Sequence, residues 1–118
     1  MENIERKIIA AGAASGPRVT PDDVEDAISQ ENYFTAWDGA EAGPNHVSHR
    51  PDPALKLLTF CVLVLKNGFT VTGESACASP ENFNAAIGRE IARADAVRKV
   101  WPLLGFRLRD QLAGGKPI

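Results

Sequence analysis

The sequence is short of the residues that mark several common classes of protein. It has two cysteines, two histidines and one methionine among 118 residues. Two cysteines are too few for the disulfide framework of a small secreted domain, and the hairpin argued below does not place Cys61 opposite Cys77. The longest apolar run, Phe60–Leu65, is as long as a strand and much too short to cross a membrane. These shortages favour a cytoplasmic protein with reduced cysteines.

Catalytic motifs are missing as well. The chain contains no G-x-S-x-G, no P-loop and no G-x-G-x-x-G. His46 and His49 are three residues apart in a loop without a nearby cysteine, so solvent-exposed histidines are a better interpretation than a metal site. Glu31, Asp38 and Glu41 are scattered acids and do not form a positioned carboxylate pair. We expect no catalytic residue, no metal and no cofactor, and hence no enzyme.

Charge is nearly balanced overall but not along the chain. The net charge of −2 argues against a binder of duplex nucleic acid, because such domains are usually strongly basic. Residues 1–53 carry 10 acids and 4 bases, whereas residues 54–118 carry 9 bases and 5 acids. This asymmetry favours anion binding by the C-terminal half, or contacts between the acidic and basic parts of two subunits. Ordinary solvated faces explain it equally well.

The length and the hydrophobic content of 44% predict one domain over residues 1–118. Thr20 and Pro21 have the positions of a cap and a first helical residue, which predicts an N-terminal helix over residues 21–30. Residues 32–37 could form a third short strand. Three prolines, two glycines and both histidines make residues 38–53 a long loop. Residues 114–118 are expected to be a loose tail.

A β-hairpin is the clearest feature of the pattern. Runs of β-forming residues over 57–66 and 69–78 flank Asn67-Gly68, which is typical of a type I′ turn. A two-residue loop pairs Val64 with Val71 and places that face in the core. The first strand is apolar on both faces, which indicates that it is central in an antiparallel sheet.

A long C-terminal helix should follow the hairpin and pack on the sheet, giving an α+β fold. Its start is expected at Ser79-Pro80-Glu81, and Pro102 should kink or break it. Two stripes run along this helix. The larger apolar stripe, expected to face the core, consists of Phe83, Ile87, Ile91, Ala94, Val97 and Trp101. The second stripe consists of the small residues Ala85, Gly88, Ala92 and Ala96, which favour tight packing or, alternatively, the approach of another subunit or a flat ligand.

Anion-binding groups border the small-residue stripe. Arg89 and Arg93 are one helical turn apart, and paired guanidinium groups suit phosphate, although local ion pairing would explain them too. Polar residues at the start of the helix surround backbone N–H groups that can receive an anion. From this chemistry the candidate ligand-binding residues are Glu74, Ser75, Asn82, Phe83, Arg89 and Arg93.

The same region carries a family resemblance. Its pattern comprises Leu58–Cys77, Ser79-Pro80-Glu81-Asn82-Phe83-Asn84, Ile87-Gly88-Arg89, Ile91-Ala92-Arg93 and Val100-Trp101-Pro102-Leu103-Leu104-Gly105. With Val19–Ile28, it resembles a family of small conserved phage and prophage proteins, among them the first Thoeris anti-defence (Tad) type. The resemblance implies a non-catalytic sponge in the cytoplasm of the infected bacterial host. Such a sponge binds a cyclic ADP-ribose isomer and, in some members, cyclic trinucleotides of CBASS defence.

The resemblance also implies a homo-oligomer, either a dimer or a hexamer built as a trimer of dimers. Neither a membrane nor duplex nucleic acid is an expected partner. The competing interpretation is a phage interaction module that docks on a host protein, with the arginines as rim charges. A weaker one is a binder of single-stranded nucleic acid that stacks bases on Phe69, Trp101 and Phe106.

Overall fold

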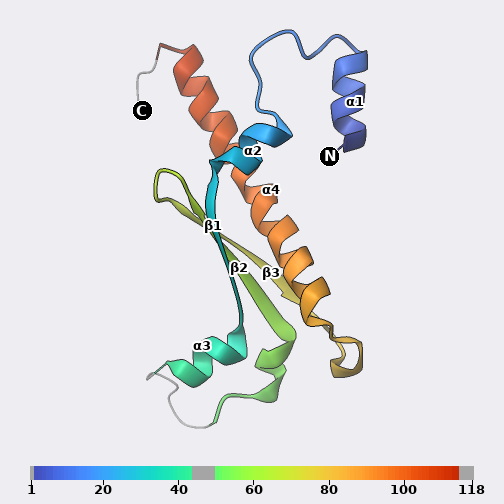
Figure 1. Cartoon of the computed structure of the whole chain (residues 1–118), viewed down its shortest axis with the longest axis vertical. Coiled ribbons are helices and arrows are strands. Elements are labelled where there is room, and N and C mark those ends of the chain that lie inside the picture. Colours follow the sequence, from blue (N-terminus) through green and yellow to red (C-terminus); the bar gives the residue numbers. More distant parts are fainter. Residues whose placement is uncertain (1, 44–49, 115–118) are drawn as a thin grey trace.

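The computed structural model describes residues 2–43 and 50–114 and shows a three-stranded antiparallel sheet with a long helix across one face (Figure 1). The helices are α1 (Glu2–Ala10), α2 (Pro21–Ala27), α3 (Ala36–Ala42) and α4 (Ala85–Leu112), with the short 3-10 helices η1 (Pro53–Leu57) and η2 (Pro80–Asn82). The strands are β1 (Ile28–Thr35), β2 (Leu58–Leu65) and β3 (Thr70–Ala76). The sheet order β1-β2-β3 confirms the α+β class and the central place of β2.

Two expectations concern residues that the structure does not describe. His46 and His49, the histidines of the expected loop, lie outside the described residues, and so do residues 115–118 of the expected tail. Helix α4 stops at Leu112, and Gly114, the first residue of the expected tail, has a φ of +94°. No helix in the described part of the chain is long and apolar enough to span a membrane.

The segment after Thr20 begins as the sequence predicts but ends earlier. The Thr20 hydroxyl accepts a hydrogen bond from the Asp23 backbone N–H, and the Asp23 carboxylate accepts one from the Thr20 backbone N–H. Together they form a capping box at the start of α2. The predicted helix over 21–30 is wrong at its end, because α2 stops at Ala27 and Ile28 opens β1. Pairing with the open edge of β2 outweighs helix propensity here. The third strand is therefore real, but it begins four residues and ends two residues earlier than expected.

Part of the expected loop is also helical. Residues 36–42 form α3, so the loop prediction over 38–53 is wrong for its first five residues. Thr35 accepts from the Asp38 N–H and Asp38 accepts from the Thr35 N–H, a second capping box. This Thr-x-x-Asp pattern was present in the sequence as a helix signal.

The hairpin turn differs from the predicted one by a single residue. The Leu65 N–H donates to the Phe69 carbonyl, so three residues, 66–68, form the loop. Gly68 has a φ of +88°, but Asn67 does not have a positive φ, as a type I′ turn would require. The Asn67 side chain instead accepts from the Phe69 N–H, as expected for a type I turn with a glycine bulge.

This slip reverses the faces of β2. Leu63, and not Val64, is opposite Val71, and Cys61 is opposite Gly73. The predicted core face of β2 is therefore wrong, because shifting the register by one residue turns every side chain to the other face. The helix-facing, buried residues of β2 are Thr59, Cys61, Leu63 and Leu65.

The start of the C-terminal helix comes later than expected, and proline does not end it. Pro80–Asn82 forms only one 3-10 turn, and α4 begins at Ala85 with the Asn84 side chain accepting from the Ile87 N–H. Pro102 lies inside α4, which continues to Leu112 without a break.

The face of α4 that meets the sheet is the small-residue face. Its buried residues are Gly88, Ala92, Ala96, Val100 and Leu104. The predicted core stripe is wrong for Ile87 and Ile91, which are 55% and 51% exposed, whereas Val97 and Trp101 are partly buried against the core. The tight-packing interpretation of the small residues is confirmed, whereas Gly88 and Ala92 are not available to a second subunit.

One backbone contact explains this choice of face. A Cβ atom at Gly73 would come within 2.1 Å of the Ala92 carbonyl oxygen and 2.3 Å of the Ala96 backbone nitrogen. The helix therefore lies directly on the backbone of β3 at this point. Only glycine on the strand and small residues on the helix permit so close an approach.

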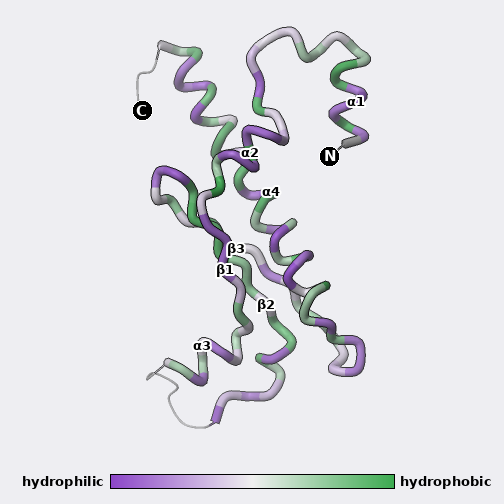
Figure 2. The backbone as a smooth tube through the Cα atoms, in the orientation of Figure 1, coloured by the Kyte–Doolittle hydropathy of each residue, from purple (hydrophilic) through white to green (hydrophobic). Residues whose placement is uncertain are grey.

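The molecule is long and thin for its mass. Its radius of gyration is 18.3 Å, against about 13.5 Å for a compact domain of this length. It exposes 8309 Å² of accessible surface, whereas monomers of this mass expose about 6,200 Å². Helix α1 stands apart from the sheet in Figure 1, and hydrophobic residues lie on it and along the length of α4 in Figure 2.

The contact at Gly73 leads to a stability prediction. Gly73→Ala should lower the free energy of unfolding by about 3 kcal/mol, because no flexible side chain can yield to the new methyl group. Gly105→Ala, in α4 with nothing within 4 Å of its added Cβ, should raise it by about 1 kcal/mol. Urea denaturation of both variants measures the difference. Equal effects at the two glycines would contradict the packing described here.

Candidate functional site

A small hollow lies where the start of α4 meets the ends of β1 and β2. It has a volume of about 130 Å³. Strands and the α3 segment supply most of its wall, and α4 together with Phe83, two residues before it, supplies the rest. Its lining residues are Tyr33, Phe34, Thr35, Asp38, Thr59, Phe83, Ala85 and Arg89. Aromatic rings, a hydroxyl, a carboxylate and a guanidinium thus meet at one helix start.

Thr59 is the unusual member of this set. It is 3% exposed, and its hydroxyl oxygen has no hydrogen-bond partner among the described residues. A buried hydroxyl without a partner costs about 1–3 kcal/mol, so native structures seldom leave one. Gly88 provides its space, because a Cβ at that position would be 2.9 Å from the hydroxyl oxygen. Because Gly88 has no side chain, the Thr59 hydroxyl can lie buried beneath the first turns of α4.

Arg89 borders the hollow without an ion-pair partner in the described part of the chain. Its side chain projects from an exposed position one turn after the start of α4. The N-terminal end of a helix as long as α4 also carries a partial positive charge. Both groups favour an anion at this end of the molecule.

Arg93, one turn further along, is placed differently. Its Nη2 atom is 2.6 Å from Oε2 of Glu25, and its Nε atom is 3.0 Å from Oε1 of Glu31. The side chain therefore connects α4 to both α2 and β1. The two carboxylates raise the pKa of Arg93, and Arg93 in turn lowers the pKa of Glu31. An anionic ligand would have to displace a carboxylate to reach this guanidinium.

Tyr33 links this ion-pair cluster to the hollow. Its hydroxyl donates to Oε1 of Glu31 at 2.6 Å. Burial, and then this hydrogen bond, raise the pKa of Tyr33 above its ordinary value. Burial also raises the pKa of the Cys61 thiol, which is opposite Tyr33 in the sheet. Cys61 and Cys77 are both free, so the expectation of no disulfide between them is confirmed.

Glu74 lies on the other side of α4. Its backbone N–H donates to Oδ2 of Asp95, and its carboxylate is 3.6 Å from the Lys99 ammonium. Arg98 donates to Oδ1 of the same aspartate at 2.5 Å. The Arg98 guanidinium, and then the Glu74 N–H, hold the pKa of Asp95 at about 2. This cluster connects β3 to α4 and is separate from the hollow.

The six predicted ligand residues are thus divided among four places. Phe83 and Arg89 line the hollow, and Ser75 is the strand partner of its Thr59. Arg93 is in the cluster with Glu25 and Glu31, whereas Glu74 is in the cluster with Asp95. Asn82 is exposed on η2, where its backbone N–H donates to the Ser79 carbonyl.

Sequence reasoning missed the strand residues of the hollow. Thr59 and Tyr33 become neighbours of Arg89 only through the pairing of the strands. The hairpin register that places Thr59 was predicted wrongly, and the pairing of β1 with β2 was not predicted. One signal was available, because a threonine among apolar residues of a central strand places a hydroxyl in the core. Within residues 2–43 and 50–114 no three metal-ligating side chains lie together.

Fold and site together define a small α+β protein with an anion-favouring hollow at the start of its long helix. The chain matches the model of the phage protein (N4 Gp49/phage Sf6 gene 66) family over residues 19–112, and it belongs to that family. The match includes the sheet, α4 and all six predicted ligand residues, and it leaves out α1. No curated protein and no solved structure matches the chain.

The Asp95 cluster predicts a dependence of stability on pH. The pKa of Asp95 is about 2 in the folded protein, below the value of about 3.9 in unfolded chains. A depressed carboxyl pKa stabilises the fold above pH 4, and this contribution is lost as the pH falls from 4 to 2. Asp95→Asn should therefore lower the free energy of unfolding at pH 5 and reduce its decline between pH 4 and pH 2. Urea titrations at each pH test this, and parallel curves for variant and wild type would contradict it.

Proposed function

We propose that this phage-family protein binds a cyclic nucleotide signal of bacterial defence and sequesters it without chemical change. The signal class comes from the resemblance to Thoeris anti-defence proteins, and the family match supports the phage setting. The observation that carries the proposal is the unpartnered Thr59 hydroxyl in a hollow bordered by Arg89. A ligand oxygen at Arg89 would balance the guanidinium charge, and it would also accept from the Thr59 hydroxyl, which is fully buried, once the start of α4 moves outward on binding.

The other walls of the hollow suit the remaining parts of such a ligand. Phe83 and Phe34 offer aromatic surface to a purine base. One oxygen of Asp38 accepts the Thr35 N–H, and its second oxygen can accept from a ribose hydroxyl or an amino group. A phosphate at Arg89 and a base on Phe83 are therefore a consistent arrangement.

The hollow is too small to hold the whole ligand in one subunit. Ligand pockets usually have volumes of about 300–1,000 Å³, and this one has about 130 Å³. We therefore propose a homo-oligomer, with a dimer as its basic unit, in which a second copy closes the site. The surplus of about 2,000 Å² over the surface expected for a monomer is an area that a stable dimer can bury.

A docking module for a host protein is the second candidate. The observation that favours it is the exposed apolar stripe of α4, in which Ile87 and Ile91 are more than half exposed. A groove on this helix, lined by Ala94, Val97 and Trp101, continues the stripe. If Ile87 and Ile91 met a host protein instead of a second copy, this face of α4 would stay exposed in the purified protein.

Release of intact ligand separates a sponge from an enzyme. The protein should deplete a cyclic ADP-ribose isomer from solution, and heating the complex should return the same nucleotide, because binding alone is involved. Mass spectrometry of the supernatant before and after heating measures both steps. Altered nucleotide would indicate an enzyme, and no depletion across a panel of cyclic dinucleotides, cyclic trinucleotides and cyclic ADP-ribose isomers would contradict the proposal.

Two substitutions test the hollow itself. Arg89→Ala should weaken binding by about 10- to 100-fold, as expected for the loss of a charged hydrogen bond. Thr59→Val should also weaken binding while unfolding stability stays equal or rises, because the methyl group replaces an unsatisfied buried hydroxyl. Isothermal titration with the ligand and urea denaturation give the two readouts.

Arg109→Ala is the matched control, since Arg109 is an exposed arginine near the other end of α4. It should bind as wild type does. Unchanged affinity in folded Arg89→Ala and Thr59→Val proteins would remove the hollow from the binding site.

A further inference from the structure

A second surface, at the other end of the molecule, has no part in the proposed ligand site. A groove of about 470 Å³ lies between α2, the hairpin turn and the C-terminal half of α4. Leu65 and Leu104 are buried at its base, whereas Phe69, Leu103 and Phe106 line it and are 56%, 37% and 57% exposed. Three large apolar side chains open to water in one groove indicate a docking surface.

Helix α1 also exposes large apolar side chains to water. Ile4 and Ile9 are 55% and 61% exposed, and no residue of α1 belongs to the hydrophobic core or is among the residues packed against it. Within residues 2–43 and 50–114, the long-range ion pair of α1 is that of Glu5 with Arg18, which has two hydrogen bonds of 2.7 and 2.8 Å. A nine-residue helix is marginal in water without a surface to pack on.

We propose that α1 of one copy docks into this groove of a second copy, so that the N-terminal helices link subunits. The isoleucines of α1 would cover Phe69, Leu103 and Phe106. Helix α1 lies outside residues 19–112, which match the family model, whereas the groove lies within them. The proposed contact is therefore an assembly contact separate from the proposed ligand site.

Charge complementarity supports α1 as the occupant. The groove is bordered by Asp23, Asp26 and Asp110, against Lys66 and Arg107. Asp26 and Asp110 have no ion-pair partner in the described parts of the chain. Helix α1 carries Arg6 and Lys7 against Glu2 and Glu5. Because Glu5 is already neutralised by Arg18, one positive charge remains in excess on α1, against one negative charge in excess around the groove.

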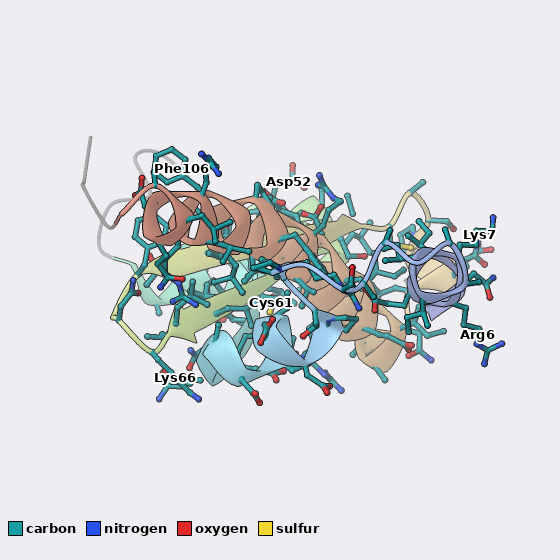
Figure 3. The ribbon with its side chains drawn as sticks, turned by 90° about the horizontal axis from the view of Figure 1, so that it is seen from above. Arg6, Lys7, Asp52, Cys61, Lys66 and Phe106 are labelled. Atoms are coloured by element: carbon teal, nitrogen blue, oxygen red, sulfur yellow. The ribbon has the colours of Figure 1, made fainter. Side chains whose placement is uncertain are left out.

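The geometry favours a second copy over the same chain. The Glu5–Arg18 ion pair holds α1 beside the segment that leads into α2. Figure 3 shows Arg6 and Lys7 at one side of the molecule, and Phe106 and Lys66 at the other. With α1 held there, its exposed isoleucines are available to a neighbour.

Engineered disulfides test the contact and its direction. Cys77→Ala removes the partly exposed native thiol from every variant, and Cys61 is buried. Mixing Ile9→Cys protein with Phe106→Cys protein under mild oxidation should give a covalent heterodimer, seen by mass spectrometry, that forms in neither sample alone. Ile9→Cys mixed with Thr72→Cys, an exposed position on β3, is the matched control and should give none.

Two results would overturn the proposal. One is the absence of the heterodimer between Ile9→Cys and Phe106→Cys proteins. The other is a disulfide within a single monomeric chain that carries both Ile9→Cys and Phe106→Cys, which would mean that α1 covers its own groove. Sedimentation gives an independent readout without cysteines. Ile4→Glu with Ile9→Glu should weaken self-association by about tenfold per isoleucine, and unchanged association would equally contradict the docking of α1.

Discussion

The rest of the structure depends on the contact between β3 and α4 at Gly73. There the strand backbone lies so close to Ala92 and Ala96 that no side chain fits between them. The contact fixes which face of α4 is buried, because only the small-residue face can approach this far. It also sets the direction of the helix across the sheet, and so brings Arg89 and Phe83 to the ends of β1 and β2 (Figure 1).

A core built from small residues leaves the large ones elsewhere. Gly88, Ala92 and Ala96 bury little apolar area, so the energy of this interface comes from the leucines and valines around them. Ile87, Ile91 and Phe106 remain on the outside of the same helix. Exposed apolar surface of this extent is typical of protein–protein interfaces, and this way of packing is the reason why self-association is proposed above.

Local signals predicted local structure, and the errors arose where tertiary pairing decides. Thr20 and Pro21 marked the true start of α2, and Asn67-Gly68 marked the turn, because caps and turns depend on adjacent residues. The register of β2 depended on whether Asn67 adopts a positive φ, which residue types alone leave open. The buried face of α4 was assigned by hydrophobicity, whereas Gly73, distant in sequence, determined it. The hollow needed both results, so only Phe83 and Arg89 were identified in advance.

The two arginines of α4 show why a pair of charges in sequence need not share a role. Arg93 meets Glu25 and Glu31 because β1 and α2 end beside it, and it serves the fold. Arg89 lines a hollow whose wall also contains Thr59, the residue with the unsatisfied buried hydroxyl. A valine at that strand position would remove the cost of burying this hydroxyl. Stability alone therefore does not explain a threonine at this position, just as it does not explain an arginine without an ion-pair partner among the described residues.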